Sequence, residues 1–358
     1  MVRLTRSATT QIFYWCGGQD DNIGDVVLRR RMLRSVQASG QCHVYVSDAT
    51  AGFREGLGLT GADTTYRSYP RFVLAALIAA VRGGGWMFAF NPGEIRCVRK
   101  QAVMHALLVP TLIVGRLRGG SVVRAGVGTR DWHWFWGRLI KLTVTLASIN
   151  AWRDEYSRSV FGSGIIRPDW AFDDGPGSVA PTTSRSRLAV TLRSDRPAPS
   201  EAWVAALRQV CADTGLAPVV VVQVRRDNAA AEALAARLGA EFVPWPAEQP
   251  HLRQETAVRA IYAESAFVVS DRLHALVMGL TEGALPAGVI EGPDVKIGRH
   301  FAAAGITAVS TDATGWNSAR VAEWITALGD RRGEIETGLA RAQQVVQITD
   351  AEIAALAG

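Results

Sequence analysis

The residues best suited to chemistry lie in the segment Ser270-Asp271-Arg272-Leu273-His274, which follows a short apolar run and opens an apolar helical segment. Open α/β sheets bind ligands at loops that join the end of a strand to a helix, and the free N–H groups that begin the helix attract anions. Arg272 supplies a permanent cation, Asp271 a carboxylate, and His274 a group that exchanges protons near neutral pH. We therefore expect a binding site for an anionic substrate at this junction.

A second junction of the same kind lies near the N-terminus, where a β-rich run is followed by Gly17-Gly18-Gln19-Asp20-Asp21-Asn22-Ile23-Gly24-Asp25. Gly24 would allow the backbone to approach a ligand, and Asn22 would form a turn or bind the ligand directly. Asp25 is either a helix-start residue favoured by the helix dipole or a carboxylate that stabilises a cationic intermediate. Two such junctions predict an enzyme with a cleft for an anionic substrate.

The elements that position these junctions alternate between apolar β-rich runs and helical segments, which predicts parallel sheets with right-handed crossovers. We expect an α/β fold with two Rossmann-like domains that face each other across a cleft. The predicted domains are 1–178, on the acceptor side, and 186–330, on the donor side, followed by a C-terminal helix over 331–358. A stretch rich in Gly, Pro, Ser and Thr over 173–187 is the predicted linker. The predicted strands are 12–16, 43–46, 86–90, 121–127, 148–152, 188–192, 218–224, 241–243, 266–269 and 285–290, and 94–116 is expected to be largely helical, with a kink or break at Pro110.

Composition narrows the class of protein. The chain has 358 residues, of which 48% are apolar and 20% charged, and this is globular composition with enough length for two domains. The net charge of +6 suits an acidic substrate or an anionic membrane surface. No basic tail or nucleic-acid motif occurs, so we expect no nucleic-acid partner. The four cysteines are scattered, which indicates neither a metal site nor a disulfide framework and fits a reducing cytoplasm.

Membrane insertion is not expected, because the longest apolar stretches, 72–81 and 106–114, are too short to span a bilayer and no signal peptide is evident. Peripheral contact at the inner face of the plasma membrane stays open. The segment Trp132-His133-Trp134-Phe135-Trp136, with Arg138 and Lys141 close behind, could stack on a sugar or lie among lipid headgroups. Packing in the core or at a domain interface is the simpler interpretation of its aromatic residues.

Several short motifs, in order along the chain, resemble the polysaccharide pyruvyl transferase family. They are Asn22-Ile23-Gly24-Asp25, Arg153-Asp154-Glu155-Tyr156-Ser157, Pro168-Asp169-Trp170-Ala171-Phe172, the Ser270–His274 segment and Lys296. The resemblance implies a fold similar to that of the two-domain GT-B glycosyltransferases. It also implies transfer of the pyruvyl group of phosphoenolpyruvate onto two hydroxyls of one sugar, which forms a ketal and releases phosphate. The sugar could be part of a glycan or a glycolipid. The motifs require no cofactor and no metal, and the acidic loops at Asp20-Asp21 and Asp173-Asp174 leave the need for a divalent metal open.

This chemistry assigns roles to the residues singled out above. His274 would give and take protons, Asp271 would fix the tautomer of its ring, and Asp25 would stabilise a cationic intermediate. The anion-binding set is Arg272, Arg153, Arg193 and Lys296, whose cations suit a carboxylate and a phosphate, with Ser270, Asn22 and Gly24 beside them.

Two other functions fit the same pattern. A GT-B glycosyltransferase with a nucleotide-sugar donor would need a carboxylate for the ribose and an apolar slot for the base, where the pyruvyl transferase needs only a compact cationic pocket. A glycan-binding scaffold without activity would keep the fold and lose the need for His274.

Overall fold

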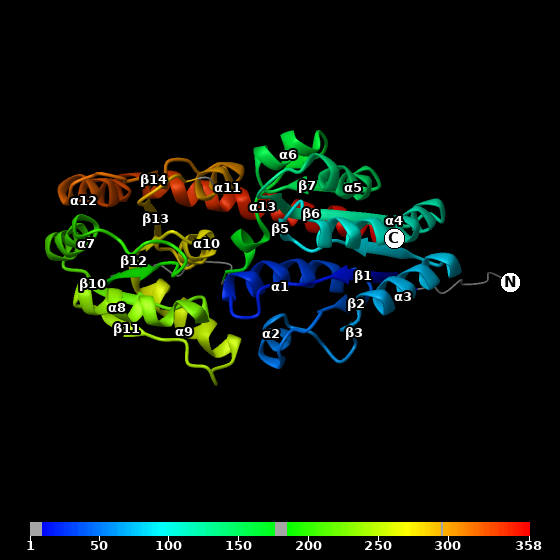
Figure 1. The fold of residues 1–358 in the computed structure, drawn as a ribbon, viewed down its shortest axis with the longest axis horizontal. Coiled ribbons are helices and arrows are strands. Elements are labelled where there is room, and N and C mark those ends of the chain that lie inside the picture. Colours follow the sequence, from blue (N-terminus) through cyan, green and yellow to red (C-terminus); the bar gives the residue numbers. More distant parts are fainter. Residues whose placement is uncertain (1–8, 176–184, 295) are drawn as a thin grey trace. The chain divides into compact units, whose positions relative to one another are not determined.

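The structure is a computed structural model that describes residues 9–175, 185–294 and 296–358, and it divides the chain into two compact units (Figure 1). Unit 1 consists of Met1–Gly18, Leu28–Trp170 and Val345–Gly358, and unit 2 of Gln19–Val27 and Ala171–Gln344. This division differs from the predicted domains in three places, the first of which is that unit 1 gives way to unit 2 after Trp170 and not after residue 178. The segment Gln19–Val27, which contains the Asn-x-Gly-Asp motif, groups with unit 2, and the C-terminal helix is divided between the units. Most of the predicted linker lies outside the described residues.

Unit 1 is built on a fully parallel sheet with the order β3-β2-β1-β4-β6-β7-β8, in which β5 pairs with β6 beside that path. Strands β1 and β4 are neighbours, with Gln11 opposite Trp86. The strands are β1 (Gln11–Trp15), β2 (Gln41–Tyr45), β3 (Thr64–Tyr66), β4 (Trp86–Ala89), β5 (Gly93–Ile95), β6 (Ser121–Thr129), β7 (Ile149–Trp152) and β8 (Ile165–Ile166).

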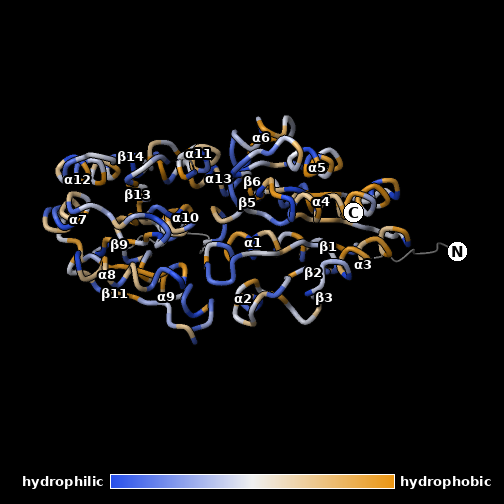
Figure 2. The backbone as a smooth tube through the Cα atoms, in the orientation of Figure 1, coloured by the Kyte–Doolittle hydropathy of each residue, from blue (hydrophilic) through white to orange (hydrophobic). Residues whose placement is uncertain are grey.

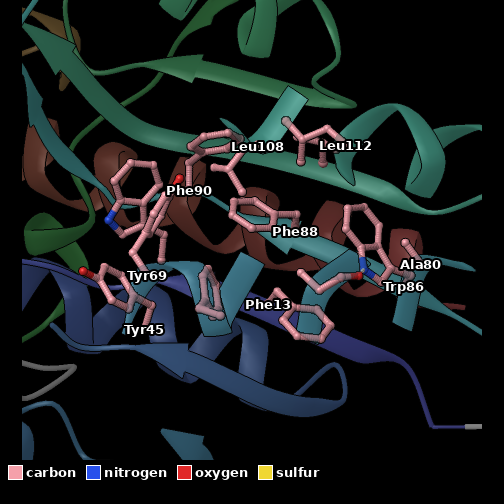
Figure 3. Close-up of a cluster of buried hydrophobic side chains, with 13 residues drawn as sticks. Phe13, Tyr45, Tyr69, Ala80, Trp86, Phe88, Phe90, Leu108 and Leu112 are labelled. Carbon is pink, nitrogen blue, oxygen red and sulfur yellow. Dashed lines mark hydrogen bonds between the residues drawn. The ribbon is translucent and has the colours of Figure 1, made fainter. Parts of the chain in front are cut away.

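The helices that lie wholly or mostly within unit 1 connect these strands. They are α1 (Ile23–Gln37), whose first turn groups with unit 2, α2 (Ala51–Gly56), α3 (Tyr69–Arg82), α4 (Arg99–Leu117), α5 (Trp134–Thr145) and α6 (Glu155–Phe161). The core between α3, α4 and the sheet is largely aromatic, and Phe13, Phe88 and Phe90 meet Leu108 and Leu112 there (Figure 3). Burial of this face holds the helices against the sheet.

The predicted helix over 94–116 is wrong at its start. Glu94 lies in β5 and pairs with Gly128 of β6, and α4 begins only at Arg99. Strand pairing there outweighs helical propensity. Pro110 lies inside α4, which the structure assigns as one helix without a break, so the expected split does not occur.

Unit 2 repeats the parallel architecture with the strand order β11-β10-β9-β12-β13-β14. Its strands are β9 (Arg187–Thr191), β10 (Ala217–Val221), β11 (Glu241–Val243), β12 (Ser265–Ser270), β13 (Leu285–Ile290) and β14 (Ser310–Asp312). Its helices are α7 (Glu201–Thr214), α8 (Asn228–Leu238), α9 (His251–Glu264), α10 (Leu273–Thr281), α11 (Ile297–Ala303), α12 (Ser318–Ala327) and the first half of α13 (Arg332–Ala357). In this order β10 and β11 are added on one side of β9, and β12, β13 and β14 on the other, so the order of strand addition reverses between β9 and β12. Such a switch point is where doubly wound sheets form a ligand crevice.

Candidate functional site

The carboxyl ends of β10, β9 and β12 lie side by side, because these strands are parallel neighbours. Residues that follow them therefore meet at one edge of the unit 2 sheet. Ser270, the last residue of β12, is opposite Thr191, the last residue of β9. The Ser270 hydroxyl donates to the Thr191 carbonyl and accepts a hydrogen bond from the Arg272 amide at 2.9 Å. Ser270 thus fixes the direction in which the chain leaves β12 at the switch point.

Asp271 connects the two loops of the switch point. Its Oδ1 accepts a hydrogen bond of 2.9 Å from the Arg193 amide, and its Oδ2 lies 3.6 Å from Arg196 Nε. Burial raises the pKa of the Asp271 carboxyl, and the Arg196, Arg272 and Arg193 guanidiniums act in the opposite direction. Over the described residues, the hydrogen bonds and ion pairs of this carboxylate go to arginines and not to His274, so the structure gives no support to Asp271 as the group that orients the imidazole.

Arg272 forms an ion pair with Asp227, which follows β10 in a 3₁₀ turn over Arg225–Asp227. Asp227 also accepts hydrogen bonds from the amide and the hydroxyl of Ser194, at 3.0 and 2.7 Å. Burial lowers the pKa of the Arg272 guanidinium, and the Asp227 and Asp271 carboxylates oppose that effect. The buried Nε of Arg272 makes no hydrogen bond to the described part of the chain. It is therefore a donor that an anionic ligand could use.

The loop before α1 attaches to the same edge of unit 2. Asn22 forms an antiparallel bridge with Val224, and the Ile23 amide donates to the Gln223 carbonyl at 3.2 Å. The Arg225 amide donates to the Asp21 carbonyl at 2.8 Å. The buried His251 ring makes a further hydrogen bond to the backbone of this loop through its Nε2. The two junctions found in the sequence are therefore parts of one site.

At the start of α1, directly after this loop, Gly24 lies against the imidazole of His274. A Cβ added to Gly24 would lie 2.6 Å from His274 Cβ and 2.9 Å from its Nδ1, which is closer than real carbon atoms approach. The Asn22 side chain accepts a hydrogen bond from the Gly24 amide at 3.0 Å and so shapes the turn. Asp25 Oδ2 accepts a hydrogen bond from the Gln19 amide at 2.7 Å, which closes the loop. His274 itself is half-buried in the first turn of α10.

Arg193 contributes its backbone to the site more than its charge. Its guanidinium forms two hydrogen bonds with Asp195, at 2.7 and 2.6 Å. This pairing lowers the pKa of the Asp195 carboxyl to about 2.

Lys296 follows the carboxyl end of β13 and precedes α11, so it belongs to the same edge of the sheet. The Lys296 amide donates a hydrogen bond of 3.0 Å to Asp294 Oδ1.

Arg153 lies in unit 1, where it forms a buried ion pair. Its Nη1 is 2.7 Å from Asp169 Oδ2, and the two side chains are 2% and 0% exposed. The neighbouring Asp154 caps α6 by accepting a hydrogen bond from the Ser157 amide at 2.8 Å. The Arg153–Asp169 ion pair thus joins two of the motifs that resemble the pyruvyl transferase family, Arg153–Ser157 and Pro168–Phe172. The predicted role of Arg153 in donor binding stays a prediction, and the structure gives this residue a partner that already balances its charge.

A pocket of about 330 Å³ adjoins the cluster within unit 2. Its walls come from the segment after β9, from α7 and α8, and from the end of β13, and they are mostly apolar. Pro197, Trp203, Leu234 and Ile290 form apolar walls, whereas Arg196 and Asp271 belong both to this pocket and to the cluster; Glu291 is also part of the lining. A pocket of this size can hold a ring system beside the charged groups.

Analysis of the sequence missed Asp227, Ser194 and Arg196. Asp227 could have been found, because the Arg225-Arg226-Asp227 segment follows a predicted strand and precedes a predicted helix, the same criterion that selected Asp271 and Arg272. Ser194 also follows a predicted strand, 188–192, but nothing in the sequence shows that its hydroxyl faces Asp227 beside the neighbouring strand. Among the residues that the structure describes, no three His, Cys, Asp or Glu side chains gather as a metal site would require.

Comparison with known proteins identifies the fold. No protein-family model matches the chain, and no curated protein sequence matches it either. Among solved structures, the chain is similar to a UDP-GlcNAc 2-epimerase from Neisseria meningitidis bound to UDP-GlcNAc, with a TM-score of 0.58 and 10% identity over 96% of this chain and 100% of that one. It is also similar to Staphylococcus aureus MnaA with UDP (TM-score 0.53, 11% identity, 93% and 91% covered) and to the glycosyltransferase of kitacinnamycin (0.57, 10%, 98% and 100%). These similarities confirm the predicted two-domain, GT-B-like α/β fold.

Proposed function

We propose that this protein is a sugar-modifying transferase whose phosphorylated donor binds at the carboxyl edge of the unit 2 sheet, and that the donor is phosphoenolpyruvate. The observation that carries the proposal is the contact between Gly24 and His274. These residues belong to two of the motifs that resemble those of pyruvyl transferases, and they lie far apart in the sequence. Their contact at a switch point, beside Arg272, is what a shared catalytic role would require.

The reaction makes clear demands on such a site. The methylene carbon of phosphoenolpyruvate gains a proton and becomes a methyl group, and the bond between the central carbon and the phosphate oxygen breaks. Two sugar hydroxyls form bonds to that central carbon. Of the two protons that these hydroxyls lose, one balances the proton on the methyl group and the other leaves with the phosphate. A group that both gives and takes protons serves both halves of this exchange.

His274 fits that role by its chemistry and its place. Imidazole changes charge near neutral pH, and His274 is half-buried at the sheet edge. The other two histidines of unit 2, His251 and His300, are buried and hydrogen-bonded to backbone carbonyls. Arg272 would hold the phosphate or the carboxylate of the donor through its buried Nε, since Asp227 already fixes the guanidinium plane.

A nucleotide-sugar glycosyltransferase is the second candidate, and two observations favour it. The structures with the same fold include proteins bound to UDP or UDP-GlcNAc. The pocket of about 330 Å³ also has the apolar walls that a base would need, with the Glu291 carboxylate among its lining residues. The comparisons therefore fit the nucleotide-sugar donor better, whereas the motifs and the His274 contact favour phosphoenolpyruvate.

Ligand binding to two variants separates the candidates. The variant Arg272→Gln removes the cation of the cluster, and Ala230→Trp fills the neighbouring pocket from an exposed lining position on α8. With phosphoenolpyruvate as donor, titration calorimetry should show binding that Arg272→Gln weakens about tenfold or more, because a charge-assisted hydrogen bond is lost. Ala230→Trp should leave that binding unchanged, and UDP should not bind.

The reverse pattern assigns a nucleotide donor: UDP binds, Ala230→Trp abolishes the binding, and phosphoenolpyruvate has no effect. Arg253→Gln is the matched control for Arg272→Gln, because Arg253 is an exposed arginine of the same unit on α9. Arg272→Gln leaves the buried Asp227 carboxylate without its cation, which by itself destabilises the fold. The double variant Arg272→Gln/Asp227→Asn removes both charges, so weak binding in this variant reports the loss of the binding cation and not the loss of folding. Release of phosphate from phosphoenolpyruvate on addition of candidate glycans then tests the transfer itself.

A further inference from the structure

Three helices of unit 1 expose large apolar side chains on their outer faces. These side chains are Leu74, Ile78 and Val81 on α3, Val103, Leu107, Ile113 and Leu117 on α4, and Trp134, Phe135 and Leu142 on α5. Leu117 is 81% exposed, Trp134 64% and Leu107 58%. We call these residues, together with the exposed Arg and Lys of the same helices, the apolar–basic face. Helices α3 and α4 are mainly hydrophobic along their length (Figure 2).

Packing of the fold does not explain these side chains. Helix α4 contacts both α3 and α5, so the three helices form one layer. Their inner positions, among them Phe72, Leu108, Leu112 and Ile140, are already fully buried against the sheet. The exposed residues are three to four positions apart along α3, and on α4 they form two pairs, Val103 with Leu107 and Ile113 with Leu117, each four positions apart. This is the spacing of residues that share one face of a helix. An exposed apolar surface of this kind marks an interaction site.

The charge of the face is of a single sign. Helices α3, α4 and α5 contain no acidic residue, and between Thr64 and Arg153 only Glu94 and Asp131 are acidic. The exposed cations of the three helices are Arg71, Arg82, Arg99, Lys100, Arg116 and Arg138. These cations lie next to the apolar residues in the sequence, as in surface-binding amphipathic helices. The Arg138 guanidinium lies 5.8 Å from the ring centre of Trp134.

We propose that the apolar–basic face binds the surface of an anionic lipid bilayer. Its Leu, Ile and Val side chains would enter the boundary between headgroups and acyl chains, Trp134 and Phe135 would lie at the headgroup level, and the Arg and Lys side chains would contact anionic headgroups. No described helix has the length and apolar composition to cross a membrane. This inference does not depend on which donor the protein uses.

Charge selects the bilayer over a second copy of the chain. Two copies that met through this face would bring Arg and Lys opposite Arg and Lys with no carboxylate between them on the three helices. Like charges at a contact are unfavourable, whereas an anionic leaflet attracts each cation near its surface. The lipid surface therefore satisfies both the apolar and the charged part of the face.

Sedimentation with vesicles tests the proposal on the full chain. We expect binding to vesicles of phosphatidylcholine with phosphatidylglycerol, much weaker binding to phosphatidylcholine alone, and a loss of binding between about 0.1 M and 1 M salt. Leu107→Ser/Leu117→Ser should lower the partition coefficient about tenfold or more, because two apolar side chains no longer leave water. Arg99→Gln/Lys100→Gln should lower it about fivefold per charge.

Matched control variants lie outside the face. Leu252→Ser/Ile348→Ser removes exposed apolar residues of α9 and α13, and Arg253→Gln/Arg341→Gln removes exposed arginines of the same helices, so both should bind as the wild type does. The proposal is overturned if neutral and anionic vesicles bind equally, or if the face variants bind like the controls. It is equally overturned if the wild type does not bind vesicles and instead forms a dimer, measured by light scattering, that the Leu107→Ser/Leu117→Ser substitutions dissociate.

Discussion

Gly24 and His274 are in direct contact, although one lies in the first turn of α1 and the other in the first turn of α10. The space between them admits no side chain on residue 24, since a Cβ there would lie 2.6 Å from His274 Cβ. The neighbouring atom is the first carbon of a side chain, which cannot rotate away, so the backbone of one segment would have to move. The glycine of the Asn-x-Gly-Asp motif is therefore required by its neighbour across the site and not only by the local turn.

Gly24→Ala should consequently displace either the loop or the imidazole. We expect a loss of about 1–3 kcal/mol in the free energy of unfolding, as for other overpacked positions, and a larger relative loss of donor binding. Urea denaturation measures the first and titration calorimetry the second. Gly333→Ala is the control: residue 333 is helical and a Cβ there meets no atom within 4 Å. That substitution should stabilise the protein by about 0.5–1 kcal/mol.

A double-mutant cycle identifies the contact as the cause. His274→Gly removes the carbon that a Cβ at position 24 would strike, so Gly24→Ala should cost much less stability in that background. If Gly24→Ala costs the same amount with and without the His274 side chain, the contact between the two residues is not what requires the glycine.

The strands that line the site could be predicted from the sequence, because apolar β-rich runs bounded by polar loops carry a local signal. The site strands β9, β10 and β12 begin and end within one to three residues of their predicted bounds, and the strands over 241–243 and 285–290 have the predicted bounds. Short elements such as α2, β3 and β14 were missed, since each is only partly buried and too brief for a periodic pattern. The attachment of Asn22 to Val224 could not be predicted, because a single bridge between distant segments leaves no trace in either of them.

The Arg153–Asp169 pair provides a prediction about stability. Arg153→Met should cost about 3–5 kcal/mol, because it leaves the buried Asp169 carboxylate without its cation. Arg153→Met/Asp169→Asn should be less damaging than Arg153→Met alone, and thermal denaturation compares the two. Any folded Arg153→Met protein should bind phosphoenolpyruvate as the wild type does. A folded variant that no longer binds this donor would restore Arg153 to the donor site.

All four cysteines are free thiols, and each should react slowly in the folded protein. Burial raises the pKa of Cys16 and of Cys42 to about 12 and that of Cys211 to about 11, and it also raises the pKa of Cys97. Even Cys211 should then hold about a hundredfold fewer thiolates at pH 8 than an ordinary cysteine, and the thiolate is the reactive form. Ellman's reagent should modify all four rapidly only in denaturant. One fast thiol in the native protein would contradict this expectation.

The site carboxylates should affect stability in opposite directions as the pH changes. Burial raises the folded-state pKa of Asp271 above its ordinary value of 3.8. Its contribution to stability is therefore complete below pH 3.8 and is lost as the pH rises through the folded-state pKa. Asp271→Asn cannot ionise and keeps an acceptor for the Arg193 amide, so its melting temperature relative to the wild type should improve from about pH 4 to pH 7.

Asp195 is the counterpart, because its pKa is lowered to about 2 by the Arg193 hydrogen bonds. Asp195→Asn should be slightly less stable than the wild type at pH 7, by a small amount because Asp195 is exposed, and this deficit should vanish as the pH falls below 3.8 towards 2. If both variants follow the same trend with pH, the environments assigned to the two carboxylates are wrong.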